Sequence, residues 1–111
     1  MWIMVCGPYT AGGADEAMRA ARLAVMNRAA LTLFRLGHVP VIGVNMALPV
    51  IATAGGDAYE EVMMPLSLAL AERCDAVLRI GGPSAGADAE LARFTAAGKA
   101  VFRRLEDVPP A

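Results

Sequence analysis

A turn of small residues in the C-terminal half of the chain carries residue types suited to ligand binding. The segment Gly81–Gly86 (GGPSAG) follows an apolar run and precedes a helical pattern. Its three glycines leave the backbone free to approach a ligand closely, and Ser84 stands where a helix N-cap is expected. A helix N-terminus with free N–H groups and a hydroxyl suits a phosphate or a sugar hydroxyl. A turn that is simply well capped fits the same spacing, so both interpretations stay open.

Glu90 is the acidic residue best placed to act beside this turn. It lies six residues after Ser84, which is ~9 Å along a helix. A carboxylate near a helix N-terminus is favoured in its ionised form. We therefore expect Glu90 to be a poor acid and a usable nucleophile. The alternative interpretation is an ordinary surface glutamate.

The other polar and sulfur-bearing residues carry weaker signals. Asn45 follows the second apolar run, where its amide would either read the edge of a base or stabilise the loop. We expect structural roles for His38, partly exposed at a helix-to-strand turn, and for Asp75, as a local cap. Cys6 and Cys74 are expected to be buried thiols, and no Cys/His cluster suggests a metal site.

Apolar runs that alternate with helical patterns indicate how these residues are positioned. Four apolar runs predict strands at residues 2–6, 39–42, 75–80 and 100–103. Helical patterns cover residues 15–36, 58–73 and 87–97, with Asp15 as the first N-cap and Pro65 beginning, kinking or dividing the second helix. Residues 43–57 are predicted as a loop because Pro49 and a Gly-Gly pair interrupt them, and residues 108–111 as a frayed end.

The order of these elements predicts one α/β domain over residues 1–111. Strands alternating with helices form a parallel sheet covered on both faces, and right-handed crossovers leave few topologies. We expect a three-layer, doubly wound sheet of the flavodoxin or Rossmann type, with its strands buried on both faces. Ligands of such sheets bind at the carboxyl ends of the strands. The loops 7–13 and 81–86 are therefore expected to open onto one crevice.

The composition excludes several classes of protein. Apolar residues make up 57% of the chain, yet no apolar stretch reaches the ~18 residues of a membrane span. The first residues lack a signal-peptide pattern, so the cytoplasm is the expected location, with no membrane association. A net charge of −1 disfavours nucleic acid as a partner. The segments Val44–Ile51 and Val62–Leu70 exceed what one small sheet covers, which predicts a homodimer or higher homo-oligomer.

Several motifs of the chain resemble the nucleoside 2-deoxyribosyltransferase superfamily. They are Cys6–Thr10, Gly37–Pro40, Cys74–Leu78 and Pro83-Ser84-x-Gly86-x-x-x-Glu90. The chain is similar to the branch of 2′-deoxynucleoside 5′-monophosphate N-glycosidases and to short bacterial members of the superfamily. The resemblance implies a flavodoxin-like fold, a homo-oligomer, and cleavage of the N-glycosidic bond of a nucleoside or nucleotide. We expect neither a cofactor nor a metal.

The resemblance also implies roles for individual residues. The glutamate matching Glu90 attacks the anomeric carbon and forms a covalent glycosyl-enzyme, which is released to water or to a second base. The serine matching Ser84 helps to hold a 5′-phosphate, together with Gly86. The substrate also contacts the first loop, whose corresponding residues here are Gly7, Tyr9 and Gly12.

Three departures from the family pattern bear on this activity. Met4 stands where related enzymes carry a tyrosine that orients the nucleophile, with Tyr9 as a partial substitute. Ser67 stands near the position of an aspartate that assists the leaving base. The candidate acids that remain in the preceding segment are Asp57, Glu60 and Glu61. The C-terminal segment that reaches the neighbouring subunit's site in longer relatives is expected to be absent.

These observations leave three hypotheses for the function. The first, which we prefer, is an N-glycosidase or glycosyl transferase with Glu90 as its nucleophile. The second is a module of the same fold that binds a nucleotide without cleaving it. The third is a small assembly subunit that uses only its apolar surface.

Overall fold

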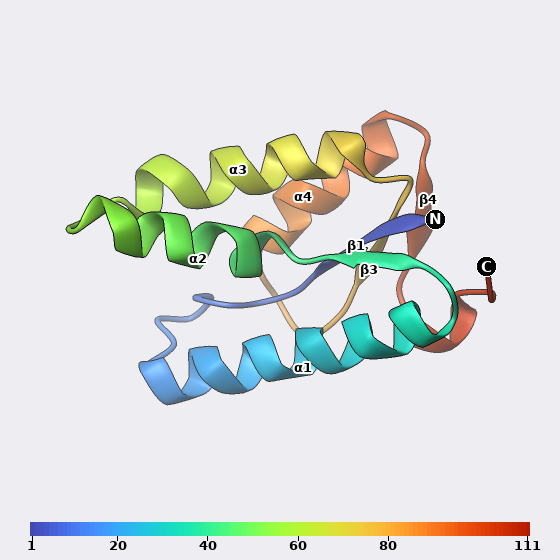
Figure 1. The fold of residues 1–111 in the computed structure, drawn as a ribbon, viewed down its shortest axis with the longest axis horizontal. Helices are drawn as coiled ribbons and strands as arrows, with labels where there is room; N and C mark the ends of the chain where they lie inside the picture. The colour runs from blue at the N-terminus through green and yellow to red at the C-terminus, as the bar shows by residue number, and fades with distance from the viewer.

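A parallel sheet of four strands, in the order β2-β1-β3-β4, forms the middle layer of the protein. The structure is a computed structural model that describes residues 1–111. Helix α1 covers one face of the sheet, α3 and α4 cover the other, and α2 packs against α3 (Figure 1). The elements are β1 (Trp2–Cys6), α1 (Glu16–Arg35), β2 (Val39–Val41), α2 (Gly43–Ala54), α3 (Tyr59–Arg73), β3 (Ala76–Arg79), α4 (Ala85–Ala96), β4 (Ala100–Phe102) and the 3-10 turn η1 (Leu105–Asp107). The predicted three-layer, doubly wound fold is confirmed.

Alternation along the central strands divides the apolar residues between two cores. Ile3 and Val5 of β1 pack toward α1, whereas Met4 and Cys6 pack toward α3 and α4. Successive side chains of a strand point to opposite faces of a sheet, so a short strand that is covered on both faces serves both cores. Burial on both faces is confirmed for β1 and β3. It is wrong for β2 and β4, because these are the two edge strands and stay partly exposed.

Local capping sets the bounds of α1 close to the predicted ones. The Asp15 side chain accepts a hydrogen bond of 2.8 Å from the backbone N–H of Met18, as expected of an N-cap. The helix ends before Gly37, whose φ of +93° is readily adopted only by glycine. The next N–H, that of His38, donates back to the carbonyl of Leu33 at 3.0 Å.

The predicted loop over residues 43–57 is wrong, because residues 43–54 form helix α2. Pro49 lies inside this helix, where it removes one backbone hydrogen bond. Packing against α3 compensates for that loss. Ala47 is completely buried, and a Cβ on Gly43 would lie 2.1 Å from the Ser67 hydroxyl oxygen, so the two helices are in close contact. Helix α3 likewise continues through Pro65 as one element.

The C-terminal residues are held against the domain, so the expected frayed end is also wrong. Val108 is buried, and the backbone N–H of Ala111 donates to the carbonyl of Leu36 at 2.9 Å. The ring of His38 is buried rather than partly exposed, with Nε2 2.7 Å from the carbonyl oxygen of Pro109. Asp75 is not a local cap, since its carboxylate accepts from the N–H of Trp2 at 2.8 Å and joins the starts of two neighbouring strands.

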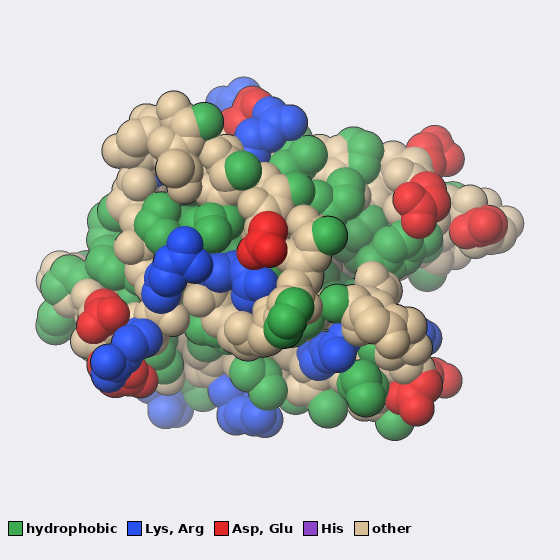
Figure 2. Space-filling view, turned by 180° about the vertical axis from the view of Figure 1, so that it is seen from behind, with side chains coloured by type: hydrophobic (Ala, Val, Ile, Leu, Met, Phe, Trp, Pro, Cys, Tyr) green, Lys and Arg blue, Asp and Glu red, His purple; other side chains and the backbone are tan.

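The surface combines scattered charges with several exposed apolar side chains. Figure 2 shows Lys and Arg interspersed with Asp and Glu over one face, and acidic side chains at the end where α2 meets α3. The most exposed of the large apolar side chains is Phe34, at 67% of its full exposure. None of the helices combines the length and the apolarity that crossing a membrane requires.

Candidate functional site

A cavity of about 400 Å³ opens at the carboxyl ends of β1 and β3, where the chain turns away to opposite faces of the sheet. Four segments form its walls: the loop after β1, the start of α2, one face of α3 and the start of α4. The expectation that the first and second glycine-rich loops open onto one crevice is confirmed. The lining residues are Gly7, Tyr9, Thr10, Ala11, Val44, Tyr59, Glu60, Met63, Met64, Ser67, Ser84, Ala85, Gly86, Ala87 and Glu90.

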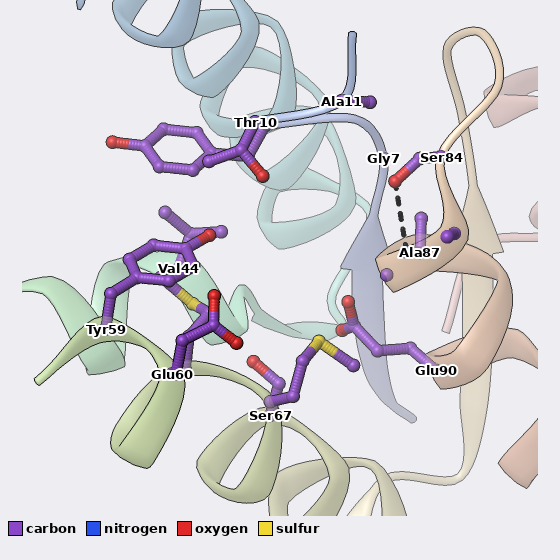
Figure 3. A pocket seen from close by; sticks show the side chains of 15 residues that line it. Gly7, Thr10, Ala11, Val44, Tyr59, Glu60, Ser67, Ser84, Ala87 and Glu90 are labelled. Carbon is purple, nitrogen blue, oxygen red and sulfur yellow. Dashed lines mark hydrogen bonds between the residues drawn. The ribbon is translucent and has the colours of Figure 1, made fainter. Parts of the chain in front are cut away.

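The start of α4 presents hydrogen-bond donors to this cavity. Ser84 is the N-cap, and its hydroxyl oxygen accepts a hydrogen bond of 3.1 Å from the N–H of Ala87 (Figure 3). The hydroxyl proton remains free to donate. The N–H groups of Ala85 and Gly86 belong to the first helical turn, which has no carbonyl partners within the helix. Together these groups form the type of helix N-terminus that binds phosphate.

Close packing between the two loops requires glycine at two positions. A Cβ on Gly7 would lie 2.8 Å from the carbonyl oxygen of Ile80. Gly81 has a φ of +79°, and a Cβ there would lie 2.7 Å from Cδ of Pro8. The loops after β1 and β3 are therefore in close contact at these two positions.

Arginines of α1 hold the loop that carries Tyr9. The guanidinium of Arg22 donates to the carbonyl oxygens of Tyr9 at 3.1 Å and of Ala11 at 2.8 Å. Arg19 donates to the carbonyl of Ala14 at 2.7 Å. These bonds satisfy carbonyls that face no other donor of the loop, so α1 orders one wall of the cavity.

Glu90 lies in the wall formed by α4, with its carboxylate directed into the cavity (Figure 3). Burial raises its pKa to about 7, and the positive charge of Arg79 opposes that rise only in part. Our expectation that the helix N-terminus keeps Glu90 ionised is therefore wrong. The favourable effect of a helix N-terminus is confined to its first turn, and Glu90 lies beyond that turn. Loss of hydration is the larger effect.

Helix α3 supplies the opposite wall. Figure 3 shows the Glu60 carboxylate directed into the cavity toward Glu90, with Tyr59 beside it and the Ser67 hydroxyl on the same helix. Of the three acidic candidates near the start of α3, the structure brings Glu60 into the site. Asp57 and Glu61 are exposed and do not line the cavity. Ser67 is buried against it.

Two predicted binding residues lie outside the cavity. Gly12 is exposed, with no atom within 4 Å of the position of a Cβ. Asn45 is exposed on α2, and its amide donates to Oδ1 of Asn27 on α1 at 2.7 Å, so it joins two helices.

Met4 is fully buried in the core toward α3 and α4 and does not line the cavity. Tyr9, its suggested substitute, does line it.

Sequence reasoning missed Tyr59, Met63 and Met64 as lining residues. A signal was present, because Glu60, Met63, Met64 and Ser67 are spaced at i, i+3, i+4 and i+7 and so share one face of a helix. Val44 carried no such signal, since its segment was predicted as a loop. Its place in the cavity depends on α2 packing against α3.

The thiols and carboxylates near the site do not form a metal centre. Cys6 and Cys74 are free and buried, and burial raises the pKa of Cys6 to about 12, with a smaller contribution from the charge of Glu90. No three His, Cys, Asp or Glu side chains gather in a way that could hold a metal ion. The chemistry available in the cavity is that of two carboxyl groups, five hydroxyl-bearing side chains and a helix N-terminus.

The fold and this site define a doubly wound α/β domain with a carboxylate-containing cavity at the carboxyl ends of its central strands. Residues 2–106 match the family described as a domain of unknown function (DUF1937), and the chain belongs to that family. No curated protein matches the chain.

Proposed function

We propose that this protein is an N-glycosidase that acts on a nucleoside or a nucleoside 5′-monophosphate. One observation carries the proposal: the Glu90 carboxyl and the capped N-terminus of α4 lie in the same cavity, opposite the carboxyl of Glu60. A nucleophile and a second carboxyl group are the parts that a retaining glycosidase needs, and an anion-binding helix end suits the 5′-phosphate of a nucleotide. The resemblance of the Pro83–Glu90 motif to nucleoside 2-deoxyribosyltransferases supports the same activity.

In the proposed reaction the sugar lies between Glu90 and Glu60. An oxygen of the ionised Glu90 attacks the anomeric carbon, and the bond from that carbon to the base nitrogen breaks with its electron pair going to the base. Glu60, when protonated, supplies the proton that the departing base takes up. Water or a second base then attacks the anomeric carbon, gives up a proton to the Glu60 carboxylate and releases Glu90 as a carboxylate.

The 5′ end of the substrate is assigned to the start of α4. The free hydroxyl proton of Ser84 and the N–H groups of Ala85 and Gly86 donate to a phosphate or a 5′-hydroxyl. Gly7 and Tyr9 form the facing wall. All the donors offered to a phosphate here are uncharged. Its affinity is therefore expected to come from hydrogen bonds and to change little with salt concentration.

The test is release of free base from a panel of ribo- and deoxyribonucleosides and their 5′-monophosphates, followed by chromatography. Glu90→Gln is expected to abolish release, because an amide is a poor nucleophile. Glu60→Gln is expected to slow release, whereas the matched variant Glu61→Gln, on the same helix but outside the cavity, keeps the wild-type rate. The proposal fails if no substrate of the panel yields base, or if Glu90→Gln releases it at the wild-type rate.

A second candidate is a nucleotide-binding module that does not cleave its ligand. It is favoured by Met4, which is fully buried and leaves no hydroxyl where related enzymes carry the orienting tyrosine. Calorimetry with a non-reacting deoxynucleoside monophosphate distinguishes the two functions. The module predicts binding of equal strength by wild type and Glu90→Gln, with no base released on long incubation.

We also propose that the protein forms a homodimer or a higher homo-oligomer in the cytoplasm. Met46 and Val50 of the apolar segment Val44–Ile51 are exposed on α2, and Phe34 and Val39 are exposed on α1 and β2. The two free cysteines fit a reducing compartment. Light scattering of the purified protein measures the mass, and a mass of 11.6 kDa would exclude the oligomer.

A further inference from the structure

Arg79 is a buried charged residue whose three side-chain nitrogens all donate hydrogen bonds to the turn that leads into α4 or to α4 itself. It ends β3, and its side chain keeps only 8% of its exposure. Nε donates to Oδ1 of Asp88 at 3.1 Å, Nη2 donates to the carbonyl of Gly82 at 2.8 Å, and Nη1 donates to the carbonyl of Ile80. One side chain thereby connects a strand end, the turn and the first turn of a helix.

The alternation of β3 directs Arg79 toward the layer that contains the site. Ala76 and Leu78 pack into the core toward α1, whereas Val77 packs toward α3 and α4. Arg79, two residues after Val77, points to the same face as Val77. Its partner in the register of β1 is Cys6, whose thiol contacts the carbonyl of Ala87 in α4. The cation therefore lies against the start of α4.

We propose that Arg79 is a positioning residue for the site: it holds the 80–83 turn and the start of α4 so that Ser84 and Glu90 face the cavity, and it places a positive charge near Glu90. This inference deepens the proposed function and depends on it for its catalytic consequence. The geometric part concerns the folded protein alone and is testable without a substrate.

Arginine is specifically suited to this arrangement. The three acceptors belong to three different residues, and the planar guanidinium offers donors in several fixed directions. A lysine ammonium keeps the charge but cannot reproduce that fork. Arg79→Lys therefore tests the geometry, and Arg79→Gln tests the charge.

The charge of Arg79 acts on Glu90 against the effect of burial. It is the one neighbouring charge that lowers the pKa of Glu90. The other titratable groups around Glu90 are Glu60 and Tyr59 of α3 and Tyr9 of the first loop, which line the same cavity, and Cys6 of β1, on which the charge of Glu90 acts. None of these is a cation. Removal of the positive charge leaves burial unopposed, so Glu90 binds its proton more tightly and is ionised less often at neutral pH.

The experiment is an NMR titration of the Glu90 carboxyl carbon in protein labelled at glutamate, with Glu90→Gln identifying the resonance. In Arg79→Gln we expect the titration midpoint to move to higher pH, and each pH unit of movement lowers the ratio of ionised to protonated Glu90 tenfold. In Arg79→Lys we expect a midpoint near that of wild type. In Arg79→Lys we also expect faster amide exchange at Ala87, because the guanidinium no longer holds the capped turn.

Several outcomes overturn the inference. An unchanged Glu90 midpoint in Arg79→Gln would show that the charge of Arg79 does not act on Glu90. Unchanged amide exchange at Ala87 in Arg79→Lys would show that Arg79 does not position the start of α4. If Arg79→Gln does not fold, Asp88→Asn replaces it, since the Asp88 side chain is 62% exposed. That variant leaves the Arg79 charge uncompensated, so the midpoint of Glu90 is expected to fall, and a constant midpoint refutes the coupling.

Measurements of turnover separate this inference from the proposed function. In an active enzyme, the pH midpoint of kcat/KM in Arg79→Gln moves with the NMR midpoint, whereas Arg79→Lys mainly raises KM for a 5′-monophosphate. A merely structural role would lower stability and leave both midpoints in place. If the protein cleaves no nucleotide while the NMR midpoint still moves, the proposed function fails and the role of Arg79 in arranging Glu90 stands.

Discussion

Glu90 is expected to make the folded protein less stable at alkaline than at acidic pH. Its pKa is about 7 in the folded chain and 4.5 when unperturbed. Between these values the folded state binds more protons than the unfolded state, so the free energy of unfolding falls as pH rises from 4.5 to about 7 and is constant above. At 1.36 kcal/mol per pKa unit, Glu90 makes the free energy of unfolding at pH 8 about 3 kcal/mol lower than at acidic pH. That is a large share of the stability of a small domain.

The matched substitution is Glu90→Gln, which keeps the shape of the side chain and cannot ionise. We expect urea unfolding at pH 8 to show the variant more stable than wild type by up to about 3 kcal/mol, with the difference vanishing near pH 4. The control is Glu61→Gln, because Glu61 is exposed on α3 and should change stability by less than about 0.5 kcal/mol at either pH. The reasoning is refuted if Glu90→Gln gains nothing at pH 8, or if its gain is the same at pH 4.

Four further predictions concern activity and packing. In Glu60→Gln, which has no acid at that position to titrate, kcat/KM should rise tenfold per pH unit below about pH 7, because only ionised Glu90 attacks, and should level off above; a flat profile from pH 5 to 8 would contradict this. Ser84→Ala should cost about 1 kcal/mol in urea unfolding through the lost cap and should weaken binding of a 5′-monophosphate more than of the nucleoside. Asn45→Ala should leave nucleotide affinity in calorimetry unchanged, because Asn45 bonds to Asn27 outside the cavity. Gly43→Ala should destabilise the protein by roughly 1–3 kcal/mol through overpacking against Ser67. The loss should be smaller in a Ser67→Gly background. Gly82→Ala is the control, because a Cβ at Gly82 meets open space.

Much of the fold was predictable because its signals are local. Asp15 before a helical pattern and Gly37 after it set the ends of α1 through a side-chain cap and a left-handed residue. Apolar runs identified the four strands, and their alternation with helices identified a parallel sheet. Residues 43–54 were not predictable in this way. Pro49 is a local signal against a helix, and what outweighs it is the contact of α2 with α3, between residues far apart in the sequence.

The site divides in the same manner. The sequence by itself determined that Ser84 caps a helix beside a glycine-rich turn and that Glu90 lies on that helix, because both follow from short-range spacing. The tertiary structure decided which residues oppose them. It brought Glu60 into the cavity and left Asp57 and Asn45 outside. It also decided the protonation of Glu90, because a pKa depends on burial and on the charge of Arg79, and both are properties of the packed chain rather than of any sequence window.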